Sequence, residues 1–237
     1  MILRMTVAII PARGGSKGIP LKNLQPVNGV SLLKRAISSA LASGVFDHVF
    51  VSTDHDGIAQ AGLDSDASVL RRAAAFSGDE ASTESTVLSH LEDDRLSSSD
   101  VLAILQCTSP FIAPASLREA SQMLGSDLTL GSVFSARPDH SFRWHLEENG
   151  GWAPSGHSRE YRPRRQDLNP SVIETGGFYF LRTPLFQANE TRFCGKLGVV
   201  PVTMLEGVEI DTPEDLKVAN LLAVEWDRTQ IENANKQ

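Results

Sequence analysis

The sequence is poor in cysteine and has no long apolar run. Its 237 residues include only Cys107 and Cys194, which lie far apart in unrelated contexts. This excludes a disulfide framework and the spacing of zinc ligands, so both are expected to be reduced, structural thiols. Residues 1–10 give too few apolar positions for a signal peptide or a membrane span, and no later run approaches the length of a span. We therefore expect a cytoplasmic protein without a membrane partner.

The chain also lacks an excess of positive charge. It has 22 basic and 29 acidic residues, which give a net charge of −7. An acidic surface repels phosphate polymers, so nucleic acid is not expected as a partner. Hydrophobic residues make up 41% of the chain, enough for the core of an ordinary globular protein. An anionic substrate would have to be attracted by a local cluster of Arg and Lys.

Apolar runs bounded by turn signals alternate with helix-like stretches along the chain. This alternation predicts an α/β fold with a doubly wound, mostly parallel (mixed) sheet, in which ligands bind beyond the carboxyl ends of the strands. Strands are expected at residues 6–12, 48–53, 101–106, 129–136 and 177–181, with a short apolar segment at residues 69–70. Helices are expected at residues 31–43, near 85–92, and from 212 onward.

Residues 138–170 interrupt this alternation. The stretch is rich in Arg, Gly, Pro and His and shows little apolar periodicity. A loop of that length in a compact domain is usually functional or contacts another subunit. We expect residues 1–237 to form a single domain that carries an irregular insertion at about residues 138–170.

The most informative segment is residues 13–23, RGGSKGIPLKN, which follows the first predicted strand directly. Its three glycines allow the backbone to approach an anion and to direct N–H groups toward it. Its cations, Arg13, Lys17 and Lys22, surround one turn and are suited to a polyphosphate. The pattern is neither the Walker sequence nor the dinucleotide-binding G-x-G-x-x-G. From the residues alone, a flexible basic turn is the alternative.

Five blocks of sequence resemble the CMP-N-acylneuraminate synthetases, also called acylneuraminate cytidylyltransferases. The first is residues 9–23 (IIPARGGSKGIPLKN), and the others follow in the family's order: VSTD at 51–54, QCTSP at 106–110, RPRRQ at 162–166 and IDTPE at 210–214. The resemblance implies a Rossmann-like nucleotidyltransferase fold with an inserted region for dimerisation and sugar binding. It also implies a homodimer that uses CTP, a free sialic-acid-type sugar and Mg2+.

The resemblance assigns a nucleotide site to the amino-terminal part of the chain. The implied nucleotide-binding residues are Ala12, Arg13, Ser16, Lys17, Asn23, Arg72, Ala81 and Thr83. Lys22 matches a family lysine that stabilises charge on the α-phosphate and on the leaving pyrophosphate, so it is a predicted catalytic residue. For Arg72, a solvated strand end is the alternative.

The resemblance places a sugar site in the middle of the chain. The implied sugar-binding residues are Gln106, Arg143, Arg164 and Tyr179. Gln106 ends a predicted buried strand, where its amide could instead brace the following turn. Arg164 belongs to a cluster of four guanidiniums at residues 159–165 that could bind a carboxylate, and it is also a predicted catalytic residue. The alternatives for the cluster are a solvated loop or a dimer contact.

Glu209 and Asp211 are the predicted magnesium ligands, and Asp211 is the third predicted catalytic residue. On a strand end, side chains at positions i and i+2 share a face, and one or two carboxylates suit Mg2+. The family typically has Asp at both positions, so Glu209 is a departure that puts direct contact in question. Asp211 could instead be a helix N-cap, with Glu214 at the third helical position.

These assignments imply transfer of CMP from CTP to the anomeric hydroxyl of an N-acylneuraminate, with release of pyrophosphate. The nearest alternative is activation of another nonulosonate, such as Kdn, legionaminate or pseudaminate, with Kdo ranked lowest because its enzymes have a glycine-poor phosphate loop. A nucleotidyltransferase for sugar 1-phosphates is a second alternative, and a non-enzymatic nucleotide-binding relative is a third. The presence of both Lys22 and Asp211 argues against the last of these.

Overall fold

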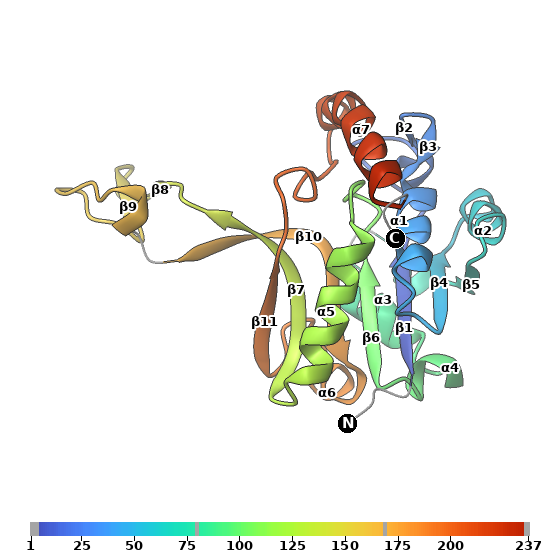
Figure 1. Cartoon of the computed structure of the whole chain (residues 1–237). Coiled ribbons are helices and arrows are strands. Elements are labelled where there is room, and N and C mark those ends of the chain that lie inside the picture. Colours follow the sequence, from blue (N-terminus) through green and yellow to red (C-terminus); the bar gives the residue numbers. More distant parts are fainter. Residues whose placement is uncertain (1–4, 79–80, 168–169, 235–237) are drawn as a thin grey trace.

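A computed structural model describes residues 5–78, 81–167 and 170–234. Its centre is a seven-stranded sheet (Figure 1). In spatial order the strands are β11 (Lys196–Pro201), β7 (Leu130–Asp139), β10 (Ser171–Arg182), β6 (Val101–Leu105), β1 (Thr6–Pro11), β4 (His48–Thr53) and β5 (Ser68–Arg71). β10 is antiparallel to both of its neighbours, whereas the other pairs of this sheet are parallel. The predicted doubly wound, mostly parallel sheet is confirmed.

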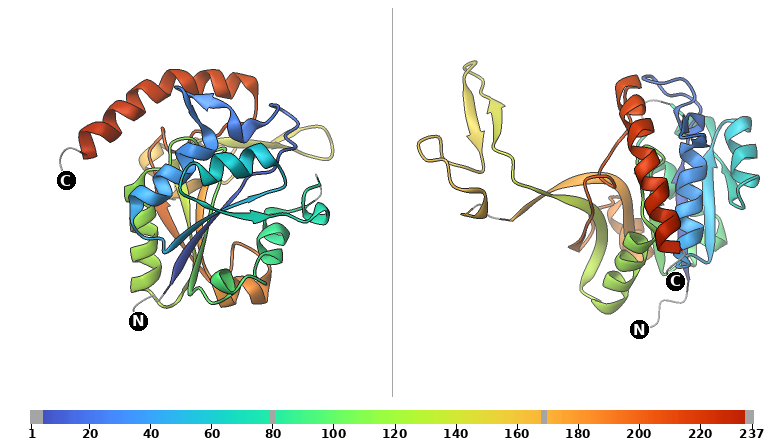
Figure 2. Two further views of the ribbon diagram at one scale, coloured as in Figure 1. Left: turned by 90° about the vertical axis from the view of Figure 1, so that its right-hand side faces the viewer. Right: turned by 45° about the horizontal axis from the view of Figure 1, so that its top comes forward.

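Helices cover both faces of the sheet (Figures 1 and 2). Alternate residues of β1 face opposite ways, so that Ala8 and Ile10 join one buried cluster while Val7 and Ile9 join the other. The first cluster packs under α1 (Leu32–Ser43), α2 (Asp56–Leu63), α5 (Pro114–Ser126) and α7 (Pro213–Ala234). The second packs under α3 (Thr83–Ser89), α4 (Asp94–Ser97) and α6 (Thr183–Asn189).

The strands and helices expected from the sequence are present, with shifted ends. β4 has the predicted bounds, and α1 begins after the cap residue Ser31 and ends at Gly44, whose φ of 66° is left-handed. β10 begins at Ser171, well before the predicted strand at 177–181. The structure also contains elements that the sequence analysis did not identify, among them α2, α4, α5, α6, β5 and β11.

The predicted irregular stretch is a projecting arm, defined here as residues 140–170, of which the structure describes residues 140–167 and 170. β7 and β10 carry it away from the body of the molecule (Figures 1 and 2). It is less irregular than expected, because it contains a hairpin of β8 (Arg143–Leu146) and β9 (Trp152–Ser155) and the short 3-10 helix η3 (Arg165–Asp167). The pairing of β10 with β7 is interrupted between Glu174 and Tyr179, as in a β-bulge, which bends strands.

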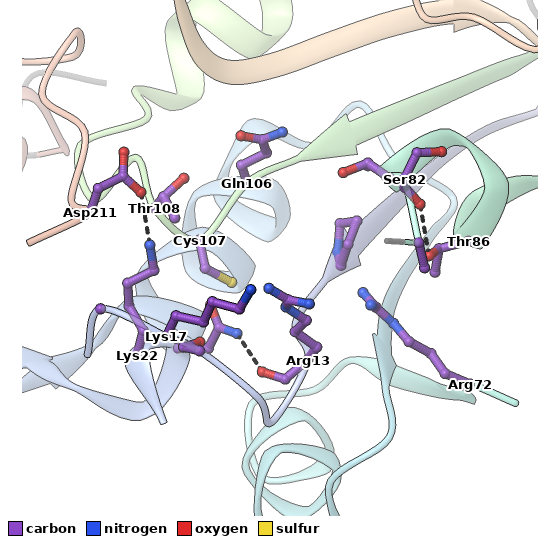
Figure 3. Close-up of a pocket in the computed structure, with 16 residues that line it drawn as sticks. Arg13, Lys17, Lys22, Arg72, Ser82, Thr86, Gln106, Cys107, Thr108 and Asp211 are labelled. Atoms are coloured by element: carbon purple, nitrogen blue, oxygen red, sulfur yellow. Dashed lines mark hydrogen bonds and ion pairs between the residues drawn. The ribbon is translucent and has the colours of Figure 1, made fainter. Parts of the chain in front are cut away.

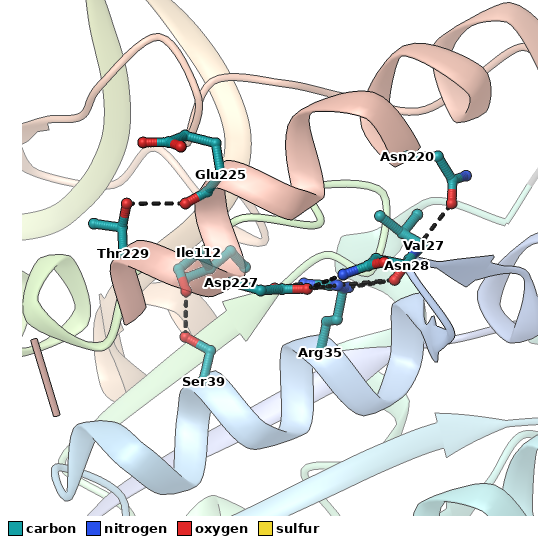
Figure 4. A network of polar contacts seen from close by, with 9 residues as sticks. All are labelled: Val27, Asn28, Arg35, Ser39, Ile112, Asn220, Glu225, Asp227 and Thr229. Atoms are coloured by element: carbon teal, nitrogen blue, oxygen red, sulfur yellow. Dashed lines mark hydrogen bonds and ion pairs between the residues drawn. The ribbon is translucent and has the colours of Figure 1, made fainter. Parts of the chain in front are cut away.

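A polar network fixes the carboxyl-terminal helix α7 over α1 (Figure 4). Arg35 of α1 makes two hydrogen bonds to the carboxylate of Asp227, of 2.8 and 2.9 Å, and it also donates to the Val27 carbonyl. The Arg35 side chain is 8% exposed and that of Asp227 is 31% exposed, so a partly buried, bidentate pair holds the two helices. Asn28, in the turn between β2 (Pro26–Val27) and β3 (Val30–Ser31), donates to the same Asp227 carboxylate. This anchoring fixes α7, whose first turn directly follows residues 209–211.

In the described part of the chain, no helix has both the length and the apolar character needed to cross a bilayer. The predicted single-domain organisation and cytoplasmic location stay predictions.

Candidate functional site

A cleft of about 430 Å³ opens beyond the carboxyl ends of the parallel strands β1, β5 and β6 (Figure 3). Parallel strands end at the same edge of a sheet, so the segments that follow them meet there. The residues that line the cleft are Pro11, Arg13, Ser16, Lys17, Gly18, Lys22, Asn23, Arg72, Ala81, Ser82, Thr83, Thr86, Gln106, Cys107, Thr108 and Asp211. Most of the predicted nucleotide-binding residues are therefore brought together.

The loop of residues 13–23 is held in shape by contacts to neighbouring segments. Gly14 donates its N–H to Asp54 at 2.8 Å, and the Asn23 amide donates to the Arg13 carbonyl at 3.0 Å. Leu21 has a left-handed φ of 46°, which reverses the chain just before Lys22 and Asn23 in the 3-10 helix η1 (Lys22–Leu24). The buried Asn23 therefore connects the two ends of the loop and closes it around the cleft.

The three loop glycines serve different purposes. A Cβ at Gly18 would lie 2.5 Å from the Asp211 carbonyl oxygen, and one at Gly14 would lie 2.9 Å from the His55 side chain. Gly15 has open space where its Cβ would be. The structure thus adds a second reason for two of these glycines, beside the predicted approach of an anion. Two of them allow close packing against other parts of the protein, and Gly18 brings the loop against Asp211.

Four cationic side chains line the cleft. Arg13, Lys17 and Lys22 come from the loop, and Arg72 follows β5 (Figure 3). Arg13 also donates to the Gly78 carbonyl at 3.1 Å. Among the described residues that line the cleft, Asp211 is the one carboxylate set against these four cations. In a protein of net charge −7, this concentration of positive charge attracts a polyanion to the cleft.

Lys22 and Asp211 are in direct contact across the cleft (Figure 3). The Lys22 ammonium lies 2.9 Å from Asp211 Oδ1 and 2.9 Å from the Ile210 carbonyl oxygen. The Lys22 side chain is 15% exposed and that of Asp211 is 68% exposed. The loop cations and the predicted metal ligand therefore belong to one cleft, as the sequence hypothesis requires.

Asp211 is not the cap of α7. The capping box is formed one residue later: the Thr212 hydroxyl accepts from the Asp215 N–H, and the Asp215 carboxylate accepts from the Thr212 N–H. The cap prediction with Glu214 was therefore wrong by one residue. It follows that the Asp211 side chain is available for a role in the cleft.

Glu209 lies beside Asp211, but not on a strand end. β11 ends at Pro201, and residues 208–211 belong to no helix or strand. Partial burial and the neighbouring Asp211 charge raise the pKa of Glu209, while Lys22 opposes the shift. The two carboxylates therefore influence each other electrostatically. The described part of the chain has no group of three His, Cys, Asp or Glu residues suited to a metal.

Arg72 is directed into the cleft by a buried pair behind it. Its Nε donates to the Ser52 hydroxyl at 2.9 Å and to the Ser52 carbonyl at 3.2 Å. The Ser52 hydroxyl lies 2.7 Å from His90 Nε2. Because Arg72 is the donor to Ser52, the hydroxyl proton points to His90, which must accept as a neutral imidazole. Burial, then the Arg72 charge, lowers the pKa of His90. Arg72 is therefore oriented toward the cleft and is not the solvated strand end considered above.

Five predicted site residues do not line this cleft: Glu209, described above, and the four that follow. Ala12 is buried in the core and donates its N–H to the Ser52 carbonyl. Tyr179 is 2% exposed within the sheet, and its hydroxyl donates to Glu174. Arg143 and Arg164 lie on the arm side, where they pair with Asp139 and Asp167 respectively. Of the four predicted sugar-binding residues, Gln106 lines the cleft of its own chain and the other three do not.

The sequence analysis missed Ser82, Thr86 and Thr108, which also line the cleft. Ser82 caps α3, a position that its residue type could have indicated, since its hydroxyl accepts from the Ser85 N–H. It also missed Arg192, whose surroundings in the sequence carry no recognisable motif and which contacts Gln106 behind the cleft.

Comparisons with known proteins agree with this architecture. The solved structure of a CMP:2-keto-3-deoxy-manno-octonic acid synthetase complexed with CTP is similar, with a TM-score of 0.68 and 22% identity over 93% of this chain and 99% of that chain. A 4-diphosphocytidyl-2C-methyl-D-erythritol synthase from Anaerococcus prevotii has a TM-score of 0.66 and 15% identity over 92% of this chain and 98% of its own. At these identities the likeness shows the fold.

Sequence similarity is more specific. N-acylneuraminate cytidylyltransferase A of Danio rerio is 38% identical over 215 residues, which are 90% of this chain and 49% of the relative. The N-acylneuraminate cytidylyltransferase of Oncorhynchus mykiss is 41% identical over 74% of this chain and 41% of its own length. That of Streptococcus agalactiae serotype V is 27% identical over 88% and 51%. The chain thus spans about half the length of the curated relatives it matches.

The profile of one protein family, described as Cytidylyltransferase, matches residues 7–149. The match includes the loop of residues 13–23 and the strands β1, β5 and β6, beyond whose ends the cleft opens. It covers more than half of the 237 residues. On this evidence, the chain belongs to the cytidylyltransferase family.

Proposed function

We propose that this chain transfers CMP from CTP to the anomeric hydroxyl of a sialic-acid-type 2-keto sugar acid and releases pyrophosphate. The observation that carries the proposal is the cleft in which Arg13, Lys17, Lys22 and Arg72 surround a space beside Asp211. Four cations suit a triphosphate far better than a neutral ligand. The similarity to proteins named N-acylneuraminate cytidylyltransferase supports the choice of nucleotide and sugar.

In this proposal, the triphosphate lies over the loop of residues 13–23. Arg13, Lys17 and Arg72 neutralise its charge, and Lys22 stabilises the negative charge that develops between the α-phosphate and the leaving group. The attacking hydroxyl oxygen forms a bond to the α-phosphorus, and the bond from this phosphorus to the bridging oxygen breaks. The hydroxyl proton passes to solvent. The remaining proposed nucleotide contacts are Ala12, through its backbone only, and Ser16, Asn23, Ala81 and Thr83.

Mg2+ is proposed as the cofactor, held by Asp211 and Glu209. Burial, and then the charge of Asp211, raise the pKa of Glu209, and a bound divalent cation would offset both effects by stabilising the two carboxylates. Their oxygen donors suit Mg2+, which completes its coordination with phosphate oxygens and water. When bound, the ion would supply neutralisation of phosphate charge. The chain's own contribution is to fix Asp211 through Gly18, Lys22 and the anchored helix α7.

The sugar acid is proposed to bind between Gln106 and an arm from a second subunit. Arg143 and Arg164 remain candidates for its carboxylate, but they would have to reach a cleft other than that of their own chain. The arm exposes large apolar side chains, a feature of surfaces that bind protein. These are Trp144, Leu146, Trp152 and Tyr161, each between 47% and 65% exposed. A homodimer that covers them is therefore part of the proposal, as is an indirect role for Tyr179 in the wall behind Gln106.

The test is pyrophosphate release from each of the four common NTPs, measured with a panel of free sugar acids and of sugar 1-phosphates. Turnover that requires CTP together with an N-acylneuraminate is the expected result. Turnover with sugar 1-phosphates would identify a different acceptor from the one proposed. Turnover with other nonulosonates, but not with an N-acylneuraminate, would do the same. Absence of turnover with every pair, in a chain shown to bind CTP, would favour a nucleotide-binding protein and overturn the proposal.

A further inference from the structure

Arg192 joins three distant parts of the chain behind the cleft. It lies in the loop between α6 and β11, and its side chain is 13% exposed. Its Nε is paired with the carboxylate of Glu84 in α3, and its Cζ lies 4.6 Å from the ring centroid of Tyr179 in β10. A third contact, from Nη1, reaches Gln106 at the end of β6 at 3.1 Å. A guanidinium with three partners of this kind holds a fixed orientation.

The contact with Arg192 decides which way the Gln106 amide points. A guanidinium has only N–H donors, so the atom of Gln106 that faces it must be the acceptor oxygen. The amide nitrogen is then placed 3.2 Å from the Gly176 carbonyl oxygen, to which it donates. In this orientation the Gln106 amide forms hydrogen bonds with both Arg192 and Gly176, and in the opposite orientation it forms neither. The nitrogen keeps a second N–H, and Gln106 lines the cleft.

We infer that Arg192 is the positioning residue that makes Gln106 a hydrogen-bond donor toward the sugar subsite. This inference rests on the proposed function. The subsite would accordingly recognise an oxygen acceptor, such as the carboxylate or a hydroxyl oxygen of a sugar acid. Arg192 does not line the cleft, so its action is through Gln106.

The carboxylate of Glu84 stabilises the positive charge of Arg192. Its hydrogen bond and its attraction to Glu84 raise the pKa of Arg192 despite the opposing effect of burial. The same pair lowers the pKa of Glu84, although burial opposes that shift as well. The donor role of Arg192 is therefore constant over the working pH range. Glu84 directly follows Thr83, which lines the cleft, so the pair also connects the two ends of the proposed site.

The experiment compares Arg192→Met with Arg192→Lys and with a control, Arg95→Met. Like Arg192, Arg95 pairs with a carboxylate, that of Asp93, and its Cζ lies over an aromatic ring, 4.8 Å from the centroid of Phe50. Unlike Arg192, it makes no contact with a residue that lines the cleft in the described structure. In Arg192→Met, the KM for the sugar acid is expected to rise about three- to tenfold, as for loss of one hydrogen bond, while the KM for CTP stays near the wild-type value. Lys cannot bond Glu84 and Gln106 with the same fork, so Arg192→Lys should show an intermediate rise.

Two further variants address the mechanism of the effect. In a Gln106→Ala background, Arg192→Met should cause no additional rise in the KM for the sugar, because the residue acts through Gln106. Gln106→Glu keeps the shape but replaces the donor nitrogen with an acceptor oxygen, so the KM for the sugar must rise there too. Unchanged sugar KM in Arg192→Met or in Gln106→Glu overturns the inference, as does additivity in the double variant. Wild-type protein without turnover on any sugar acid would instead sink the proposed function.

Discussion

The loop of residues 13–23 and the arm of residues 140–170 both contain predicted site residues, but only those of the loop line the cleft. In the loop, Arg13, Lys17 and Lys22 all line one cleft with Asp211. On the arm side, Arg143 and Arg164 form ion pairs with Asp139 and Asp167, only a few residues away along the chain. The arm also projects away from the body that holds the cleft (Figure 1).

The difference follows from the sheet. Residues that follow parallel strands must meet at one edge, so a loop after β1, an arginine after β5 and a glutamine after β6 are forced together. The arm lies outside this constraint, because it is joined to the sheet by the extended ends of β7 and β10. One chain therefore brings most of the predicted nucleotide-binding residues into a single cleft but leaves Arg143 and Arg164 outside it. In the proposed function, the arm of a second subunit supplies these two arginines.

The largest effect is expected from Lys22→Ala, which tests the loop. Removal of an ammonium that stabilises the developing charge should lower kcat by about 10²- to 10³-fold, with a smaller change in the KM for CTP. The control is Lys217→Ala, because Lys217 is a highly exposed lysine in the first turns of α7. Steady-state pyrophosphate release measures both variants. An unchanged kcat in Lys22→Ala would remove its assigned role.

The next effect is expected from Asp211→Asn. An amide is a weaker ligand than a carboxylate, so the Mg2+ concentration for half-maximal rate should rise by about tenfold or more. The matched control is Thr212→Ala, which removes the cap of α7 and should cost about 1 kcal/mol of stability while leaving the Mg2+ dependence unaltered. If both variants titrate with Mg2+ as the wild type does, Asp211 is not a metal ligand.

The position of the loop and its role in the cleft were largely predictable, because the residues that indicate them are neighbours in the sequence. Glycines, cations and a preceding apolar strand are adjacent in the chain, and the alternation of strands and helices supplies the rest of the edge. The capping box was misplaced by one residue because Thr212 and Asp215 satisfy the same pattern as Asp211 and Glu214. Arg192 could not be predicted, since its role depends on Glu84, Gln106 and Tyr179, which tertiary packing brings together. Tyr179 was placed by resemblance, and its burial in the sheet was not foreseen.

An intermediate effect is expected from the arm. Arg164→Ala should lower the rate by less than Lys22→Ala does if Arg164 binds the sugar carboxylate. A mixture of the two variants tests whether Arg164 and Lys22 of one site come from different subunits. In a mixed dimer, the intact cleft of one chain would meet the intact arm of the other. Random assortment of equal amounts should then restore about a quarter of the wild-type rate. The mixture is refolded or co-expressed, and its rate is compared with that of each variant alone. No recovery would mean that arm and cleft act within one chain.

The smallest effect concerns Arg72, the cleft cation supported by the Ser52–His90 pair. The pKa of His90 is lowered by burial and by Arg72, against the attraction of Asp93, so the folded chain resists its protonation. As pH falls below about 6.5, the ordinary value for histidine, the unfolded chain binds more protons and stability decreases. His90→Gln can still accept from Ser52 but cannot be protonated, so it should flatten this acid-side slope in thermal unfolding between about pH 7 and 5. His48→Gln, at an exposed position of β4, serves as the control and should keep the wild-type slope. Equal slopes in all three proteins would show that protonation of His90 does not lower the stability of the folded chain. The assignment of a neutral His90 as the acceptor of the Ser52 hydroxyl proton would then be wrong.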